Sequence, residues 1–233
     1  MLKCAAIAVL ACALAACGAQ RPRPPPQAPS QPAAALEALP VPGSYRIDSG
    51  GSELRLLVFR AGPLASLGHN HVMVNRSVSG SVQVGAALSA SSFSFDLPID
   101  DFEIDDAQAR RDEGSEFAGE VAQDAIAGTR RNMLSSAVLD AAEFPVITVK
   151  STALEGTPRL LMAELDINVA GRRSRISVPF SLSGDSHRLT ATGSIQLRQS
   201  ALGLTPYSLM HGALQVQDAM LLKFKLVVPI DQR

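Results

Sequence analysis

Alternation of apolar and polar residues is the main pattern along this chain, and it predicts a protein built from β-strands. The clearest case starts at Val146, where the chain puts one set of side chains on one face (Ile147, Val149, Ser151) and a polar set on the other (Thr148, Lys150, Thr152). A period of two is typical of a strand with one buried and one solvated face. The same pattern recurs at 45–48, 53–60, 72–84, 92–99, 159–169, 174–183, 187–198 and 214–228.

The order of these segments predicts an all-β fold. Strands that follow one another at hairpin distance favour an antiparallel sheet, and eight or nine of them suit closure into a barrel. We expect the segments 45–48 and 53–60 to form a hairpin across the Ser49-Gly50-Gly51 turn. The interior of an eight-stranded barrel is wide enough to hold one small ligand.

Two segments interrupt the strands. Residues 100–131 are acidic and favour helical turns around 107–125, so we expect a short, partly helical excursion there. Its acids Asp101, Glu103, Asp105 and Asp106 suggest either a calcium loop or a solvated face, and the second is favoured because the glycine and closing glutamate of an EF-hand are missing. Further on, Ser135 or Ser136 is expected to cap a helical turn over 137–142 that Pro145 ends.

The N-terminus carries an export signal. Lys3 precedes an apolar run that is too short to span a membrane, and Leu14-Ala15-Ala16-Cys17-Gly18 looks like a bacterial lipobox. That resemblance implies a signal peptide over 1–16, cleavage before Cys17 and lipidation of Cys17, although cleavage after an Ala by ordinary signal processing is the alternative. Gly18 resembles the enterobacterial signal for the outer membrane, so we expect a lipid anchor on the periplasmic side of a bacterial membrane. The proline-rich residues 17–42 then predict a tether, which leaves 43–233 as the folded domain.

Composition narrows the chemistry of this domain. The net charge is -1, which gives no basic footprint for nucleic acid. All three cysteines, Cys4, Cys12 and Cys17, precede the domain, so it has no disulfide, thiolate ligand or thiol nucleophile. With no Trp, two Tyr and eight Phe among many Val, Leu, Ile and Ala, a cavity here would be aliphatic. No cofactor is expected.

Two motifs suggest other chemistry. The Ser and His of Gly184-Asp185-Ser186-His187 are adjacent, so a strand would point them to opposite faces, and a hairpin turn is favoured over an esterase fragment. His69 and His71 would project to one face of an extended segment. They either bond loop carbonyls or a ligand head group, or bind a metal with a third ligand such as His211 in a metal-dependent protein or enzyme.

Several stretches together resemble the YceI-like family of periplasmic polyisoprenoid-binding proteins, over essentially 43–228. They are Tyr45-Arg46-Ile47-Asp48, the segment with Arg131, Leu134, Ser135, Phe144-Pro145 and Ser151, Glu164-Leu165-Asp166-Ile167 with Gly171, and 197–204 ending in Leu202-Gly203-Leu204. The resemblance implies an extended lipocalin-like barrel that encloses an isoprenoid lipid, such as a quinone tail or a polyprenyl chain, without catalysis. The Leu67-Gly68-His69-Asn70-His71 segment departs from the shorter family pattern with one His.

The alternating positions also select the side chains that would line such a cavity. We expect the inward set to include Phe93, Phe95, Ile147, Val149, Phe180 and Phe224, with His69 and His71 at the head-group end. From the residues alone, these apolar side chains could equally fill the barrel as a dry core. Whether the barrel forms a homodimer is left open.

Overall fold

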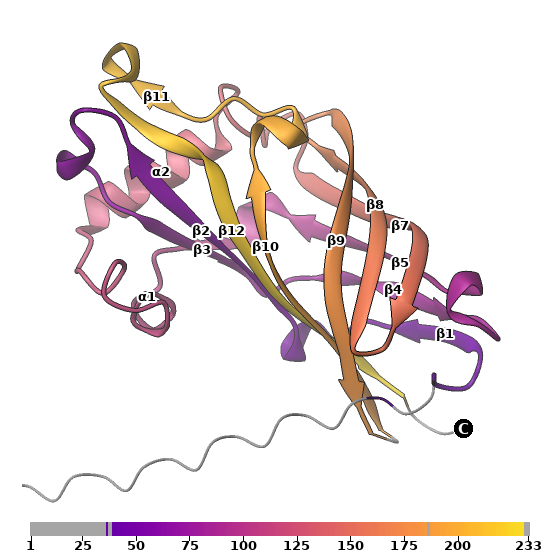
Figure 1. Cartoon of the computed structure of the whole chain (residues 1–233). Coiled ribbons are helices and arrows are strands. Elements are labelled where there is room, and N and C mark those ends of the chain that lie inside the picture. The colour runs from indigo at the N-terminus through magenta and orange to yellow at the C-terminus, as the bar shows by residue number, and fades with distance from the viewer. Residues whose placement is uncertain (1–35, 37–38, 186, 231–233) are drawn as a thin grey trace, which may run out of the picture. The chain divides into compact units, whose positions relative to one another are not determined.

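The structure is a computed structural model that describes residues 36, 39–185 and 187–230. These residues form twelve β-strands and two α-helices (Figure 1). The strands are β1 (Gly43–Arg46), β2 (Glu53–Ala61), β3 (His71–Asn75), β4 (Ser79–Val84), β5 (Ser92–Pro98), β6 (Phe102–Ile104), β7 (Val146–Thr157), β8 (Leu160–Val169), β9 (Arg172–Gly184), β10 (Arg188–Arg198), β11 (Ser208–Leu209) and β12 (Leu214–Pro229). The helices are α1 (Ala107–Asp112) and α2 (Gln123–Leu134), and the 3₁₀ turns are η1 (Ser49–Gly51), η2 (Ala65–Leu67), η3 (Leu88–Ala90), η4 (Ile99–Asp101), η5 (Ser200–Leu202) and η6 (Met210–Gly212).

All paired strands are antiparallel and form one curled sheet. Its order is β1-β4-β5-β7-β8-β9-β10-β12-β2-β3-β6, with β11 paired to β12. The curl brings the end of β1 beside β12, where the Asp48 amide donates to the Val227 carbonyl at 2.8 Å. The sheet is thus a half-barrel, and the all-β, lipocalin-like antiparallel fold class is confirmed. Twelve strands replace the expected eight or nine, because the expected segment 72–84 divides into β3 and β4 and because the short strands β6 and β11 are additional.

The expected hairpin between 45–48 and 53–60 is wrong. β1 pairs with β4, in the register Tyr45 to Val82, while β2 pairs with β12 and β3. The reason is η1, where Asp48 caps the turn by accepting from the Gly50 amide at 3.1 Å. Before the turn the Ile47 amide still donates to the Gly80 carbonyl of β4, and after the turn the chain enters β2 beside β12.

The expected helical excursion is present but its bounds differ. Asp106 caps α1 by accepting from the Ala109 amide at 2.8 Å, and Gly114 follows with a left-handed φ of 86°. α2 runs on to Leu134, well past the expected end. The helical turn over 137–142 is wrong, because Ser135 ends α2 rather than starting a new helix. Turns occupy that segment, with Asp140 at a φ of 48°.

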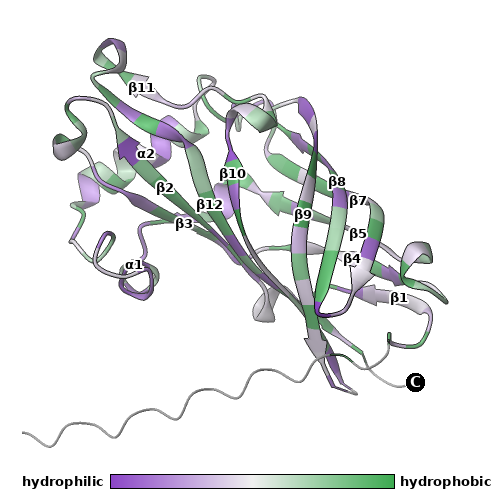
Figure 2. Cartoon of the chain, in the orientation of Figure 1, coloured by the Kyte–Doolittle hydropathy of each residue, from purple (hydrophilic) through white to green (hydrophobic). Residues whose placement is uncertain are grey.

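Two apolar clusters hold the fold together. The larger one fills the inside of the curl and is formed by residues of most strands. The smaller lies on the outer face of β2 and β3, where Leu57, Val72 and Val74 meet Ala109 and Phe117 from the α1 region. β2 is therefore apolar on both faces, and Figure 2 shows the green positions that result. Within the described residues, no helix has the length and hydropathy needed to cross a membrane.

Candidate ligand cavity

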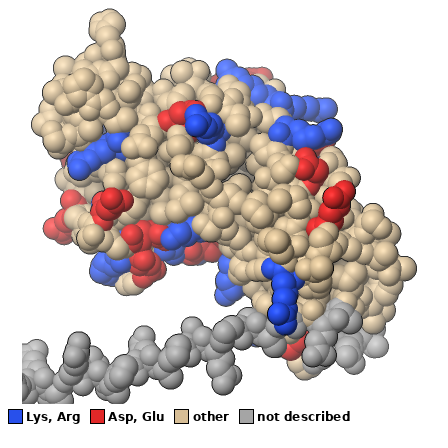
Figure 3. Space-filling model, viewed as in Figure 1, with Lys and Arg blue, Asp and Glu red and all other residues tan. Residues whose placement is uncertain are grey.

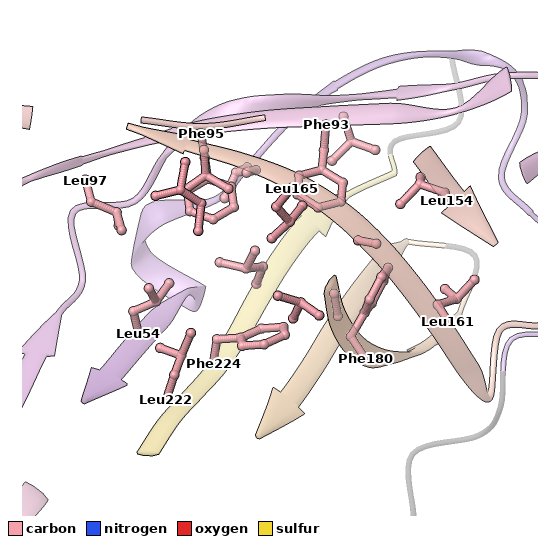
Figure 4. A pocket seen from close by; sticks show the side chains of 18 of the residues that line it. Leu54, Phe93, Phe95, Leu97, Leu154, Leu161, Leu165, Phe180, Leu222 and Phe224 are labelled. Carbon is pink, nitrogen blue, oxygen red and sulfur yellow. The ribbon is translucent and has the colours of Figure 1, made fainter. Parts of the chain in front are cut away.

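An apolar cavity of about 190 Å³ lies inside the curl. Its wall is made by residues of β2, β4 to β10 and β12 and of the segments between strands, and Ser91 is the one polar side chain among the described residues that line it. Figure 4 shows Phe93 and Phe95 of β5, Phe180 of β9 and Phe224 of β12 pointing inward toward one another. Such a wall offers contact area to a hydrocarbon chain and no hydrogen-bond partner for a sugar or a base.

The six residues expected at the ligand cavity all lie on its wall: Phe93, Phe95, Ile147, Val149, Phe180 and Phe224. Phe93 and Phe95 are nearly parallel, with ring centroids 6.1 Å apart, and Phe93 meets Phe180 edge to face at 6.4 Å. The alternation of β5 and β7 places them there, because neighbouring residues of a strand point to opposite faces. Their contact with a ligand stays a prediction.

A bulge changes which residues of β7 point inward. The register of β7 against β8 shifts between Ser151 and Ala153. Leu154 therefore lines the cavity, where strict alternation from Ile147 would have placed Ala153. The Ser151 hydroxyl accepts from the Phe93 amide at 2.8 Å, so this side chain holds β5 instead of facing a ligand.

The last residues assigned to the tether also reach this wall. Leu39 and Pro40 line the cavity, and Leu36 packs against the large apolar cluster. These three residues precede residue 43, the expected start of the folded domain, and they contact its apolar interior. A shortened protein for ligand studies should keep these residues.

A second pocket of about 460 Å³ adjoins the cavity. The two share wall residues, namely Leu56, Phe102, Ile147, Val169, Leu202 and Met220. Beyond them the wall becomes mixed and includes several polar side chains: Arg60, His69, His71, Thr129, Asn132, Gln199, Tyr207 and Gln215. The α2 helix forms one side of this pocket, and Ala125 and Gly128 leave the pocket open there because neither has a large side chain. The apolar cavity thus adjoins a second pocket whose wall is partly polar, which we call the polar end.

His69 and His71 both lie at this polar end, with ring centroids 6.3 Å apart. The His71 Nδ1 atom lies 2.6 Å from the Asp105 carboxylate. Asp105 is fully buried and also accepts from the Val72 amide at 2.9 Å and from Arg110 at 2.6 Å. A carboxylate can only accept, so the Nδ1 atom carries the proton, and in the neutral form of the ring the Nε2 atom is an acceptor.

Charge and backbone geometry hold Asp105 in its ionised form. Burial alone would raise the pKa of its carboxyl, but hydrogen bonds and charge from His71, the Val72 amide and Arg110 together lower that pKa. Arg110 is itself buried and donates to the Asn70 carbonyl at 2.7 Å. Asp105 adopts a left-handed φ of 58°. The expected solvated face is therefore wrong for Asp105, while Asp101 and Glu103 are exposed.

The structure gives no support to the metal alternatives. Among the described residues, no three His, Cys, Asp or Glu side chains are grouped so that they could hold a metal ion. His71 is paired with Asp105, and His211 lies in η6 at a left-handed φ of 54°. Asp106 caps α1 instead of joining a calcium loop.

The segment Gly184-Asp185-Ser186-His187 lies at a turn between two strands. Asp185 accepts from the amides of His187 and Arg188 at 2.8 and 3.0 Å, which is the expected hairpin turn between β9 and β10. Those bonds lower the pKa of the Asp185 carboxyl. Ser186 of the esterase-like fragment lies outside the described residues, as does Cys17.

An antiparallel sheet curled around an apolar cavity defines the lipocalin-like class of β-proteins. A family model described as the YceI-like domain matches residues 45–228. The chain therefore belongs to the YceI-like family, and the resemblance drawn from its strand motifs is confirmed. Two of those motifs are in contact. The Phe144 ring lies so close to Gly171 that a Cβ atom added at Gly171 would be 2.7 Å from the Phe144 Cε1 atom.

Two solved structures share the fold. BcnA of Burkholderia cenocepacia has a TM-score of 0.58 at 15% identity, covering 78% of this chain and 98% of that one. A polyisoprenoid binding domain from Saccharophagus degradans, implicated in plant cell wall breakdown, has a TM-score of 0.53 at 12% identity, covering 79% and 97%. A comparison with curated proteins gave no match.

Proposed function

We propose that this protein binds an isoprenoid lipid, with its chain in the apolar cavity and its head group at the polar end. The carrying observation is that two pockets adjoin and share wall residues, one with a single polar side chain on its wall and the other with two histidines. Membership of the YceI-like family supports the proposal, as does the fold shared with a polyisoprenoid binding domain. We propose a binding role without catalysis, which membership of the YceI-like family supports.

The energetics suit a long hydrocarbon. Burial contributes about 0.8 kcal/mol per methylene, so one five-carbon unit contributes up to roughly 4 kcal/mol before ordering costs. The pocket volumes of about 190 and 460 Å³ together fall in the range of ligand sites. A chain of a few units would thus be retained firmly without any charged contact.

The polar end favours a head group that donates a hydrogen bond. The Asp105 carboxylate fixes the His71 ring through its Nδ1 atom. In the neutral ring the Nε2 atom of His71 is an acceptor, and no other described residue forms a hydrogen bond with it. A hydroxyl on the lipid, as in a quinol or a polyprenol, meets that requirement. His69, Gln199 and Tyr207 line the same pocket and would contact the rest of the head group.

We further propose that the protein is a lipoprotein anchored through Cys17 on the periplasmic side of a bacterial membrane. The lipobox-like Leu14-Ala15-Ala16-Cys17 and the proline-rich segment after it support this assignment. A lipid-binding domain held at a membrane would meet its ligand at high local concentration.

Native mass spectrometry of residues 33–233 tests the ligand proposal. We expect a co-purified mass that organic solvent releases as an isoprenoid. Ala191→Phe fills the cavity from β10 and should abolish this mass, whereas Ala153→Phe, on an exposed position of β7, should leave it unchanged. Equal retention by the two variants, or a wild-type protein without any lipid mass, would count against the proposal.

His71→Phe tests the head-group part in the same measurement. The ring shape is kept and the acceptor is lost, so a hydroxyl-bearing lipid should be replaced by apolar lipids or lost. An unchanged lipid profile would show that the head group lies elsewhere.

A further inference from the structure

Two loops pack together at the open side of the second pocket and form what we call the tip, residues Ala61–Asn70 and Thr205–Ala213. The Leu64 amide donates to the Ala213 carbonyl at 2.8 Å. Gly62, at a left-handed φ of 90°, allows the close approach, because an added Cβ would lie 2.6 Å from that carbonyl oxygen. The tip is therefore one packed surface rather than two separate loops.

The tip exposes large apolar side chains. Leu67 is 71% exposed, Met210 is 68% exposed and Leu209 is 43% exposed. Met210 and His211 both adopt left-handed φ values, 51° and 54°, which non-glycine residues rarely do. The η6 turn thus holds Met210 outward at a conformational cost, a feature expected where the exposed residue has a use.

The tip also lacks formal charge. The sequence has no Asp, Glu, Lys or Arg from Ala61 to Asn75 or from Gln199 to Gln217, although 18% of the chain is charged. Figure 3 shows the result, since the upper left lobe, where Figure 1 places β11, is tan. Leu160, at the start of β8, is also an exposed apolar residue, but unlike the tip it has charged residues near it in the sequence, with Arg159 directly before it.

The tip stands at the polar end of the ligand path. Leu67 and Leu209 belong to the wall of the second pocket as well as to the exposed surface. A water-insoluble chain leaving by this route would meet apolar side chains continuously. Arg60, whose Nη1 atom donates to the Gly68 carbonyl at 2.7 Å, is the one Lys, Arg, Asp or Glu among the described residues that line this pocket. An apolar rim without carboxylates matches the interfacial zone of a bilayer, where apolar side chains are favoured and a long cationic side chain can reach the head groups.

We propose that the tip docks on a lipid bilayer and that the ligand passes between membrane and cavity there. The titratable groups of the tip are His69, His211 and the phenol of Tyr207, so no carboxylate of the tip repels anionic phospholipid. Asp105 lies behind His71 and is fully buried. The proposal that the ligand passes between membrane and cavity rests on the proposed lipid binding, whereas the proposal that the tip docks on a bilayer does not.

The absence of Trp from the sequence gives a direct measurement of docking. The full, anchored chain is placed in vesicles of phosphatidylcholine and phosphatidylglycerol that carry brominated acyl chains. Trp fluorescence of Met210→Trp should be quenched and shifted to the blue, and that of Leu160→Trp, a site with 67% exposure at another strand end, should not. Equal quenching of the two probes, or none for Met210→Trp, would overturn docking.

A charge variant tests transfer. Leu67→Asp with Met210→Asp should slow the exchange of a fluorescent polyprenol between protein and vesicle about tenfold, since the tip would no longer enter the interface. Leu160→Asp is the matched control and should leave the rate unchanged. Co-purified lipid is measured in each variant by native mass spectrometry.

The lipid measurement separates the two proposals. Slower exchange with normal lipid content supports docking, and unchanged exchange overturns it. Absence of lipid from the wild type overturns the proposed function instead, while leaving the quenching result intact. If the wild type is a dimer by light scattering and the double Asp variant is a monomer, the tip covers a second copy of the chain and the membrane assignment is wrong.

Discussion

At the scale of single residues, Asp105 determines much of the polar end. Its carboxylate joins His71, Arg110 and the β3 backbone at Val72. Sequence alone could not distinguish it from Asp101 and Glu103, because all three belong to one acidic run. The pairing of β3 with β6 decides which of them is buried, and this pairing joins segments nearly thirty residues apart.

Replacement of Asp105 should destabilise the protein strongly. Asp105→Asn keeps the size of the side chain and tolerates the left-handed backbone, but leaves buried Arg110 without its counter-charge, which costs about 3–5 kcal/mol. Asp101→Asn, at an exposed site, should cost little. Urea unfolding at neutral pH measures both, and equal stability of the two variants would show that the ion pair contributes nothing.

The same variant should change the pH dependence of stability. Since folding lowers the pKa of Asp105, its contribution is complete above the ordinary carboxyl value of 3.8 and is lost as the pH falls through the lower folded value. Wild type should therefore lose stability in this acid range, and Asp105→Asn should lose less. Parallel curves of unfolding free energy against pH would contradict this assignment.

At the scale of elements, periodicity predicted the long strands well and the short connections badly. The strands β8, β9, β10 and β12 begin and end within about two residues of the expected segments, because each has a hydrophobic face long enough to establish its period. β1 was assigned to the wrong partner, since a four-residue strand with a glycine turn fits a hairpin locally and only η1 redirects it.

The cavity wall was predictable for the same reason, and its polar end was not. Alternation identified the inward side chains of β5, and those of β7 up to Ser151. The bulge after Ser151 changes the alternation, so the sequence pattern did not predict that Leu154 lines the cavity. The second pocket depends on α2, η5 and β11 meeting β2, which no local pattern specifies. Only the two histidines in the β2–β3 loop signalled it in the sequence.

One glycine of β10 should limit the cavity. The Phe224 ring from β12 lies against Gly193, and an added Cβ would meet its Cε1 atom at 2.6 Å and the Pro179 carbonyl at 2.9 Å. Gly193→Ala should push the ring into the cavity, lower stability by about 1–3 kcal/mol and reduce bound lipid. Gly119→Ala, with no atom within 4 Å of the new Cβ, is the control. Equal unfolding midpoints and lipid content in both would contradict this packing.

At the scale of the whole molecule, the two membrane attachments that we propose, the acyl anchor on Cys17 and the tip, would differ in strength. An acyl anchor contributes about 0.8 kcal/mol per buried methylene, so two or more chains give lasting attachment. The tip exposes three large apolar side chains and would bind reversibly. We therefore expect the anchor to decide where the protein resides and the tip to decide how often the cavity meets the bilayer.

The anchor assignment leads to a simple test. Cys17→Ala should leave the chain without acyl groups, so the protein should move from the membrane fraction to the wash at alkaline pH and lose its lipoprotein mobility on gels. Cys12→Ala is the matched control, because Cys12 lies in the apolar part of the same segment and should tolerate the change. If both variants stay in the membrane with wild-type mobility, Cys17 carries no lipid, and any attachment must come from the tip alone. In that case salt and dilution should release the protein, since an interfacial contact is reversible.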